Sequence, residues 1–250
     1  GLFIASGPQT QARLQQVAGL SQTLLSPIIA VREDEIAKPH HHEDATEPYL
    51  IYAGGLRPEK GPFVMLRALA KLWARGCRIP LKMAAVPAAA IEGLRADIAA
   101  LGLPAEAVQI LPFMPRHELM DLMRSSRAFL CFNFRDSGCM ALLEAVALGV
   151  PSICFDNEEQ FWLPHEFSCK LAVRGQSMAQ LEDALAEAMR SACESPRPDG
   201  AWHARRMAWL RRCMTWDARL RYLEACYHLV CTCDSQLLEP PILPSFDCSL

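Results

Sequence analysis

The sequence predicts an α/β domain built on a Rossmann-like, doubly wound parallel sheet, followed by helices near the C-terminus. Two observations support this fold class. Short apolar stretches typical of buried strands alternate with helical patterns along most of the chain. At residues 128–156 a strand, a helix and a second strand follow one another at the spacing of a right-handed parallel βαβ unit. Ligands are therefore expected at the carboxyl ends of the strands.

The unit at residues 128–156 has well-marked boundaries. Residues 128–134 are apolar and rich in aromatic side chains, which indicates a buried strand. Residues 140–148 are strong helix formers, and Gly149 stands at the expected C-cap of that helix. Residues 152–155 then begin the next buried strand.

Glu144 is the one charged residue of this otherwise apolar helix. A carboxylate buried there is costly unless it has a partner. Asp136 lies at the mouth of the helix, roughly 12 Å away at about 1.5 Å per residue. The two acids are therefore candidates for contacting the two ends of an elongated ligand. The alternative is that Asp136 caps the helix and Glu144 reaches solvent.

The turn between the two acids is suited to an anion. Asp136 and Ser137 are natural N-cap residues, and Gly138 allows a tight turn before the helix. The backbone amides of Gly138, Cys139 and Met140 lie where a helix N-terminus can bind a phosphate. A nucleotide-sugar, with hydroxyl groups at both ends and phosphates between them, has the matching shape.

A second strand–glycine–helix junction lies earlier in the chain. Residues 49–61 are predicted to form a strand and a glycine-containing turn. Residues 62–75 follow as an amphipathic helix with proline at its first position. Lys60 stands at the mouth of this turn and is a candidate phosphate ligand. The alternative for Lys60 is an ordinary surface lysine.

The remaining elements are weaker predictions. Further strands are expected at residues 1–6, 81–86, 108–111 and 170–173, with an extended segment at 24–31. Further helices are expected at residues 10–19, 91–101, 118–124, 178–193, 202–214 and 216–231. The proline-rich tail over residues 239–250 is expected to be poorly ordered.

Composition excludes several classes of protein. A net charge of −3 gives no reason to expect nucleic-acid binding. The sequence contains no apolar run of about 18 residues, so no transmembrane helix is predicted. No signal peptide is recognisable. The 11 cysteines lack a regular spacing, which favours reduced thiols and a cytoplasmic protein. The histidines at residues 40–42 fit a solvated linker better than a metal site.

The residues of the βαβ unit resemble a known family. Asp136 and Glu144, with Ala145, Gly149 and Pro151 after them, resemble the E-x7-E signature of retaining glycosyltransferases with the GT-B fold. The resemblance is to family 4, the glycosyl transferases group 1. In that family the motif lies in the C-terminal, donor-binding domain, so the resemblance implies transfer of a sugar from a nucleotide-diphosphate sugar with retention of configuration.

The resemblance extends to other segments of the chain. Residues 49–61 resemble the family's G-R-L-x-x-x-K-G loop, and residues 113–115 resemble the segment that wraps the nucleotide base. It implies that Asp136 contacts the donor sugar, Glu144 the ribose and Lys60 the diphosphate. No metal or other cofactor is implied. The implied catalytic residues are Lys60 and Asp136. The implied donor-binding residues are Gly55, Arg57, Lys60, Phe113, Met114, Asp136, Ser137, Gly138, Cys139, Met140 and Glu144.

The same resemblance predicts the domain organisation. Residues 1–47 would be a remnant of an N-terminal GT-B domain and a linker, which makes the missing part of that domain a partner. Residues 48–196 would form the donor-binding domain, and residues 197–250 the C-terminal helices and tail. A glycan, a lipid or another molecule would be the acceptor. Arginines near Trp202 and Trp209 leave open a peripheral contact with a membrane.

Departures from the family pattern keep other functions open. The family arginine falls on Gly55, with Arg57 two residues later, and residues 87–90 replace the usual glycines. Glu158 and Glu159 add charge near the expected diphosphate. These departures favour a degenerate, non-catalytic nucleotide-sugar-binding or assembly domain as the alternative. A GT-B-like epimerase or phosphorylase is the third possibility, although no lysine convincingly suited to a phosphorylase cofactor is present.

Overall fold

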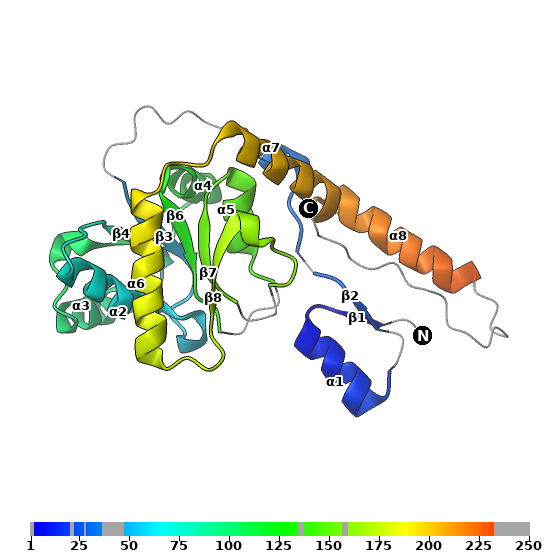
Figure 1. Ribbon diagram of the computed structural model, residues 1–250, viewed down its shortest axis with the longest axis horizontal. Helices are drawn as coiled ribbons and strands as arrows, with labels where there is room; N and C mark the ends of the chain where they lie inside the picture. The colour runs from blue at the N-terminus through cyan, green and yellow to red at the C-terminus, as the bar shows by residue number, and fades with distance from the viewer. Residues whose placement is uncertain are drawn as a thin grey trace.

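A parallel sheet of six strands forms the centre of the molecule (Figure 1). The computed structural model describes residues 3–20, 23–27, 29–36, 48–134, 138–156 and 160–232. The strand order is β5-β4-β3-β6-β7-β8, and every pairing is parallel. The strands are β3 Leu50–Ala53, β4 Leu81–Val86, β5 Val108–Pro112, β6 Ala128–Cys131, β7 Ser152–Asp156 and β8 Ser168–Ala172. The doubly wound α/β fold is thereby confirmed.

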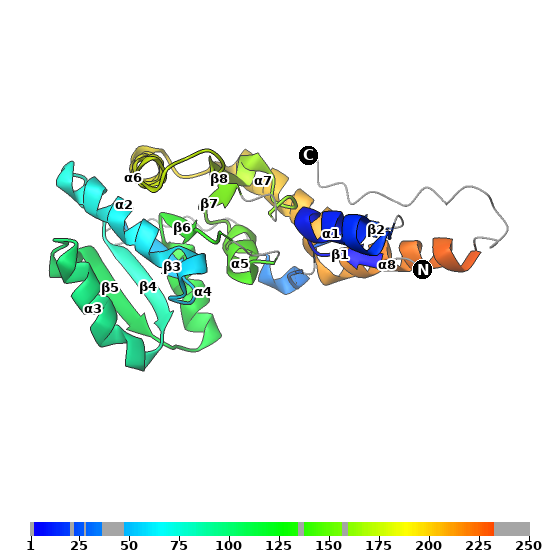
Figure 2. The same cartoon turned by 90° about the horizontal axis from the view of Figure 1, so that it is seen from below.

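Helices cover both faces of this sheet, and each face has its own apolar core. On one face α2 Pro62–Ala74, α3 Ile91–Ala100 and α6 Met178–Glu194 pack against the strands. On the other face lie α4 Arg116–Ser125, α5 Met140–Leu148 and α7 Gly200–Trp209. Figure 2 shows α6 and α4 on opposite sides of the sheet. This double coverage explains why the central strands are apolar on both faces rather than alternating.

The strand order reverses between β3 and β6, which are neighbours although β4 and β5 separate them in sequence. At such a switch point the connections leave the carboxyl edge of the sheet in opposite directions. Doubly wound sheets bind their ligands at such switch points. The segments that follow β3 and β6 contain the two glycine-containing turns singled out in the sequence.

The N-terminal segment forms a separate unit of β1 Phe3–Ala5, α1 Pro8–Ala18 and β2 Thr23–Leu25, in which the two strands pair in parallel. A short 3-10 turn, η1 Glu33–Glu35, follows it. The segment before η1 is held by the C-terminal part of the chain. The Val31 amide donates to Met214 O at 2.9 Å, and the Trp216 amide donates to Val31 O at 3.1 Å.

The C-terminal part of the described chain is a long helical arm. A π-helical turn, Leu210–Met214, joins α7 to α8 Trp216–Thr232. Figures 1 and 2 both show α8 running beside β1 and β2. Buried Arg219 of α8 reaches the N-terminal segment and donates to Pro27 O at 2.8 Å. Within the described residues, no helix has both the length and the apolarity needed to cross a membrane.

Several predicted boundaries differ from the observed ones: α1 begins at Pro8 instead of residue 10, and β8 spans Ser168–Ala172 instead of residues 170–173. β6 ends at Cys131 instead of residue 134, and the helix predicted to begin at residue 118 begins at Arg116. The single helix predicted over residues 202–214 is α7 followed by the π-helical turn. The π-helical turn redirects the chain so that Thr215 forms a parallel bridge with Val31.

Candidate functional site

The turn after β3 is built tightly against the end of β6. Gly61 closes this turn with a φ of 70°, and a Cβ placed there would lie 2.3 Å from Phe132 O. The Phe134 amide donates to Glu59 O at 2.8 Å. Only glycine permits both this backbone conformation and this approach. The two connections that leave the switch point are therefore in direct contact.

Lys60 occupies the end of this turn, in the 3-10 segment η2 Pro58–Lys60. The Tyr52 hydroxyl donates to Gly55 O at 2.7 Å and fixes the turn from below. Arg57 points to solvent and forms an ion pair with Glu59 at 3.2 Å, with 70% of the arginine side chain exposed. Arg57 and Lys60 thus share the turn that the sequence assigned to phosphate binding.

The start of α5 lies at the same, carboxyl edge of the sheet. Cys139 occupies the N-cap position, and its side chain forms no capping hydrogen bond. This corrects the expectation that Asp136 or Ser137 would be the N-cap, because helical conformation begins only at Met140. Asp136 and Ser137 themselves lie outside the described residues, as do the histidines at 40–42, the acids Glu158 and Glu159, and the tail over residues 239–250.

A pair of thiols lies under this helix start. The sulfur atoms of Cys131, at the end of β6, and Cys139 are 3.4 Å apart. Both residues are buried, and the hydrogen bond to Cys139 together with burial raises the pKa of the Cys131 thiol. A thiol whose pKa is raised in this way is a poor nucleophile, which favours a packing role for Cys131. The eight cysteines whose side chains the structure describes form no disulfide with one another.

Glu144 has a partner that the sequence did not reveal. Arg116, at the start of α4, donates from Nε at 3.2 Å and from Nη2 at 2.7 Å to the same carboxylate oxygen, Oε1. The Arg116 Nη1 atom lies 3.0 Å from Oε1 of Glu35 in η1. The hydrogen bond to Glu144 raises the pKa of Arg116. The carboxylate is thus compensated within the chain, and its side chain is 15% exposed.

These three side chains line a cavity of about 670 Å³ between η1, α4 and α5. Its walls combine acidic and basic groups with the apolar side chains of Val31, Ile36 and Leu148. Phe113 and Met114, expected to contact the base, lie just before α4, with Phe113 71% exposed. Arg116 could have been noticed in the sequence, because it follows those two residues at the carboxyl end of a predicted strand. Its pairing with Glu144 could not.

The described candidate residues all lie in segments that leave the carboxyl ends of β3, β5 and β6. They are Gly55, Arg57, Lys60, Phe113, Met114, Gly138, Cys139, Met140 and Glu144. A strained residue marks the same edge: Ala85 near the end of β4 has a φ of 58°, where the register with β5 shifts. Such conformations in non-glycine residues are costly and concentrate at functional sites. Their individual roles stay predictions.

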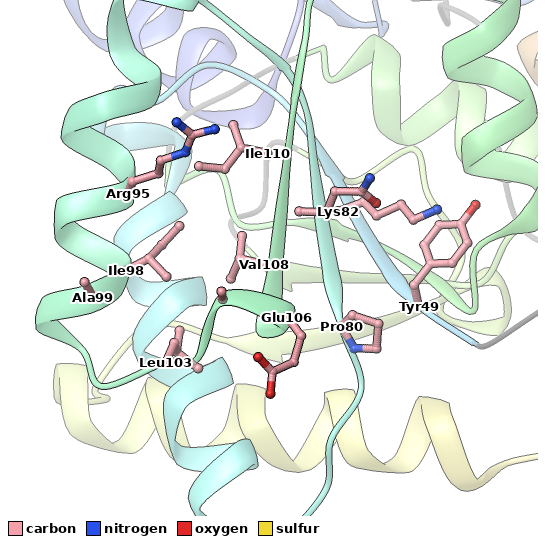
Figure 3. Close-up of a pocket in the computed structure, with 12 residues that line it drawn as sticks. Tyr49, Pro80, Lys82, Arg95, Ile98, Ala99, Leu103, Glu106, Val108 and Ile110 are labelled. Carbon is pink, nitrogen blue, oxygen red and sulfur yellow. The ribbon is translucent and has the colours of Figure 1, made fainter.

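A larger cavity of about 1140 Å³ lies at the opposite, amino edge of the sheet (Figure 3). Tyr49 and Pro80 precede β3 and β4, and the Lys82 ammonium lies 3.7 Å from the centre of the Tyr49 ring. Burial lowers the pKa of Lys82. Size alone favours this cavity, but doubly wound sheets bind their ligands at the carboxyl edge. Topology therefore favours the turns at the carboxyl edge, toward which the smaller cavity extends at Arg116 and Glu144.

The family model of glycosyl transferases group 1 matches residues 33–198. The D-inositol 3-phosphate glycosyltransferase of Nocardia farcinica (strain IFM 10152) is 28% identical over 144 residues, which cover 56% of this chain and 32% of that enzyme. The chain therefore spans about a third of the length of this curated relative.

Solved structures share the fold at low sequence identity. A glycosyltransferase from Rickettsia africae superposes with a TM-score of 0.73 at 14% identity, covering 92% of this chain and 64% of that one. The Anabaena protein HepE, solved in complex with UDP-glucose, superposes with a TM-score of 0.71 at 16% identity, covering 91% and 64%. At these identities the likeness concerns the fold alone.

Proposed function

The chain belongs to the glycosyl transferases group 1 family and has the α/β fold of GT-B glycosyltransferases, and on this premise we propose that it transfers a sugar from a nucleotide-diphosphate sugar to an acceptor with retention of configuration. In this reaction the bond between the anomeric carbon and the diphosphate breaks, and its electron pair leaves with the diphosphate. A bond to an acceptor hydroxyl oxygen forms on the same face of the sugar, and the hydroxyl proton passes to the departing diphosphate. The acceptor is a glycan, a lipid or another hydroxylated molecule.

One observation carries this proposal: the Lys60 turn and the end of β6 are in direct contact at the switch point of the sheet. The Glu59–Phe134 hydrogen bond of 2.8 Å and the packing of Gly61 on Phe132 hold the two turns together. A diphosphate bound there would meet the Lys60 ammonium from one side and the first amides of α5 from the other.

The proposed roles follow from that placement. Lys60, with Arg57 beside it, and the amides from Gly138 to Met140 stabilise the departing diphosphate electrostatically, so no metal is required. Asp136 contacts the donor sugar, and Ser137 lies next to it at the mouth of the helix. Glu144 accepts hydrogen bonds from the ribose, while Gly55, Phe113 and Met114 complete the donor site. UDP-sugars are the first donors to test, because HepE was solved with UDP-glucose.

The domain organisation is also a proposal. Residues 1–47 would belong with a neighbouring N-terminal domain and its linker, residues 48–196 would bind the donor, and residues 197–250 would pack back toward that domain. The backbone hydrogen bonds of Val31 to Met214 and Trp216, at 2.9 and 3.1 Å, support a joint between the first and last of these segments.

A non-catalytic donor-binding or assembly domain is the second candidate. The ion pair of Glu144 with Arg116 at 2.7 Å favours it, because this carboxylate already has an internal partner. The pairing of Arg57 with Glu59 points the same way. A non-catalytic donor-binding domain would bind the donor without turning it over, and an assembly domain would bind no donor.

Calorimetric titration with UDP-, GDP- and ADP-sugars tests the proposal. At least one donor should bind, and Lys60→Ala should weaken that binding about tenfold, because a charge-assisted hydrogen bond contributes roughly 1.5–3 kcal/mol. The matched control is Arg95→Ala, which removes an equal charge from exposed helix α3 and should change nothing. Binding without release of nucleoside diphosphate in the presence of acceptors would favour the second candidate. No binding of any donor would refute the proposed transferase and leave only an assembly role.

A further inference from the structure

Arg116 makes an uneven contact with Glu144. Both of its hydrogen bonds to that residue, from Nε at 3.2 Å and from Nη2 at 2.7 Å, end on Oε1. Within the described residues, the other oxygen, Oε2, accepts no hydrogen bond. A carboxylate oxygen offers about two lone pairs, so Oε2 retains its full capacity to accept hydrogen bonds from a ligand. The guanidinium thus fixes the orientation of the carboxylate and leaves Oε2 available to a ligand.

Arg116 is itself held from its other side. Its Nη1 atom lies 3.0 Å from Oε1 of Glu35, and Oε2 of Glu35 accepts from the Arg32 amide at 2.8 Å. The same short segment is anchored by Arg211, whose Nε donates to Glu33 at 2.6 Å. The guanidinium therefore bridges two carboxylates on different elements. A side chain with 54% exposure would otherwise sample several rotamers, and this bridge restrains it.

We propose that Arg116 is a positioning residue for donor binding: it holds the Glu144 carboxylate so that Oε2 faces the ribose hydroxyls, and Glu35 holds Arg116 in turn. This inference rests on the proposed function. On this inference the ion pair no longer favours a non-catalytic domain, because the contact orients Glu144 for a ligand. Arg116 touches no reacting atom, so its effect is on affinity for the ribose.

The test compares two nucleotides that differ only in the groups that Glu144 would contact. UDP and 2′,3′-dideoxy-UDP are titrated into the wild-type chain, with GDP or ADP and their dideoxy forms used instead if the donor panel favours those bases. The wild type should prefer the ribose form. Arg116→Ala should weaken binding of the ribose form about fivefold, as expected for an exposed ion pair, and leave the dideoxy form unchanged.

Two further variants test the role of Glu35 and provide a control. Glu35→Gln leaves Arg116 in place but weakens its anchor, so it should produce a smaller loss of the same preference. Arg75→Ala is the matched control away from this cavity: Arg75 follows α2 on the other face of the sheet and pairs with Asp183 at 2.8 Å, so its removal should leave the preference for ribose intact. Melting temperatures of all variants separate a loss of folding from a loss of positioning.

The outcomes distinguish the inference from the function on which it rests. A ribose preference that Arg116→Ala leaves at the wild-type level would overturn the positioning role and spare the proposed function. Tighter binding by Arg116→Ala would also overturn it, since that result means that Arg116 competes with the ligand. A wild type that binds both nucleotides equally, or binds neither, would remove Glu144 from a ribose site and overturn the inference together with that part of the proposed function.

Discussion

Glu144 sits on an apolar helix, and its partner Arg116 is half exposed, so the ion pair contributes at most about 1 kcal/mol to stability. Glu144→Gln keeps the shape of the side chain and weakens the charge-assisted hydrogen bonds to the ribose. Donor affinity should fall about tenfold, while the melting temperature changes little. Thermal melting and calorimetric titration of the same preparation check this. Lost stability with unchanged affinity would assign Glu144 a purely structural role.

Gly61 and Gly102 allow a matched comparison at the residue scale, because both have a φ of 70°. A Cβ at Gly102 meets nothing within 4 Å, whereas one at Gly61 meets Phe132 O at 2.3 Å. Gly102→Ala should therefore cost about 1 kcal/mol of unfolding free energy from backbone strain alone. Gly61→Ala should cost more than about 2 kcal/mol and also weaken donor binding, because the two turns must separate. Denaturant unfolding measures both, and equal costs would contradict the predicted clash.

Helices α2 and α6 are joined by ion pairs that make a prediction about pH. The Asp183 carboxylate lies 3.2 Å from Lys71 Nζ and 2.8 Å from Arg75 Nη2. The hydrogen bond from Lys71 is the main reason that the pKa of Asp183 lies below its usual value, and Arg75 adds to the effect. A depressed acidic pKa stabilises the fold above the unfolded-state value, near pH 4, and this contribution is lost as the pH falls through the folded-state value.

Asp183→Asn should therefore lower the melting temperature slightly at neutral pH and flatten its decline in acid. Melting curves recorded from neutral pH down to about pH 2 test this. Asp97→Asn on α3 is the control, since Asp97 forms no ion pair within the described residues. An acid decline as steep in Asp183→Asn as in the wild type would show that other carboxylates dominate.

The sequence predicts best the elements whose ends are set by residues at the ends themselves. The bounds of α5 and β4 were predicted correctly, because Gly149 takes a left-handed conformation at the end of α5 and a continuous apolar run defines β4. β6 was predicted too long because the aromatic residues Phe132 and Phe134 leave the sheet to pack on the Gly61 turn. Composition alone cannot distinguish these two uses of an apolar segment.

Long-range partners mark the limit for the candidate site. The two turns could be placed at one edge of the sheet from the order of strands and helices alone. The partner of Glu144 is Arg116, 28 residues away. The helix that carries Arg116 was predicted to begin only at residue 118. The close packing of Gly61 on Phe132, where an added Cβ would lie 2.3 Å from Phe132 O, likewise joins two turns separated by three strands in the chain. Such contacts depend on how elements pack, and no local pattern encodes them.

At the scale of the whole molecule, the sheet and the helical arm differ in how well they are covered. The sheet is packed on both faces, whereas the arm exposes large apolar side chains. Trp216 and Leu220, one turn apart on α8, are 50% and 52% exposed, and Phe3 and Ile4 of neighbouring β1 are each 39% exposed. Clustered exposed apolar residues of this kind mark surfaces that bind another protein or domain. This fits the proposal that an N-terminal domain packs here.

Replacing Trp216 and Leu220 together by serine should therefore lower the binding of a hydrophobic fluorescent dye and any self-association of the isolated chain. Donor affinity should stay unchanged, because the candidate site lies at the carboxyl edge of the sheet. Met178→Ser is the control: Met178 is 45% exposed on α6, away from α8, and its replacement should leave dye binding near the wild-type level. Dye fluorescence, sedimentation and titration measure the three quantities. If the double variant binds dye as the wild type does, the arm is not the uncovered surface.

On the same reasoning the isolated chain should bind donor but turn it over slowly, since the acceptor would be held by the neighbouring domain.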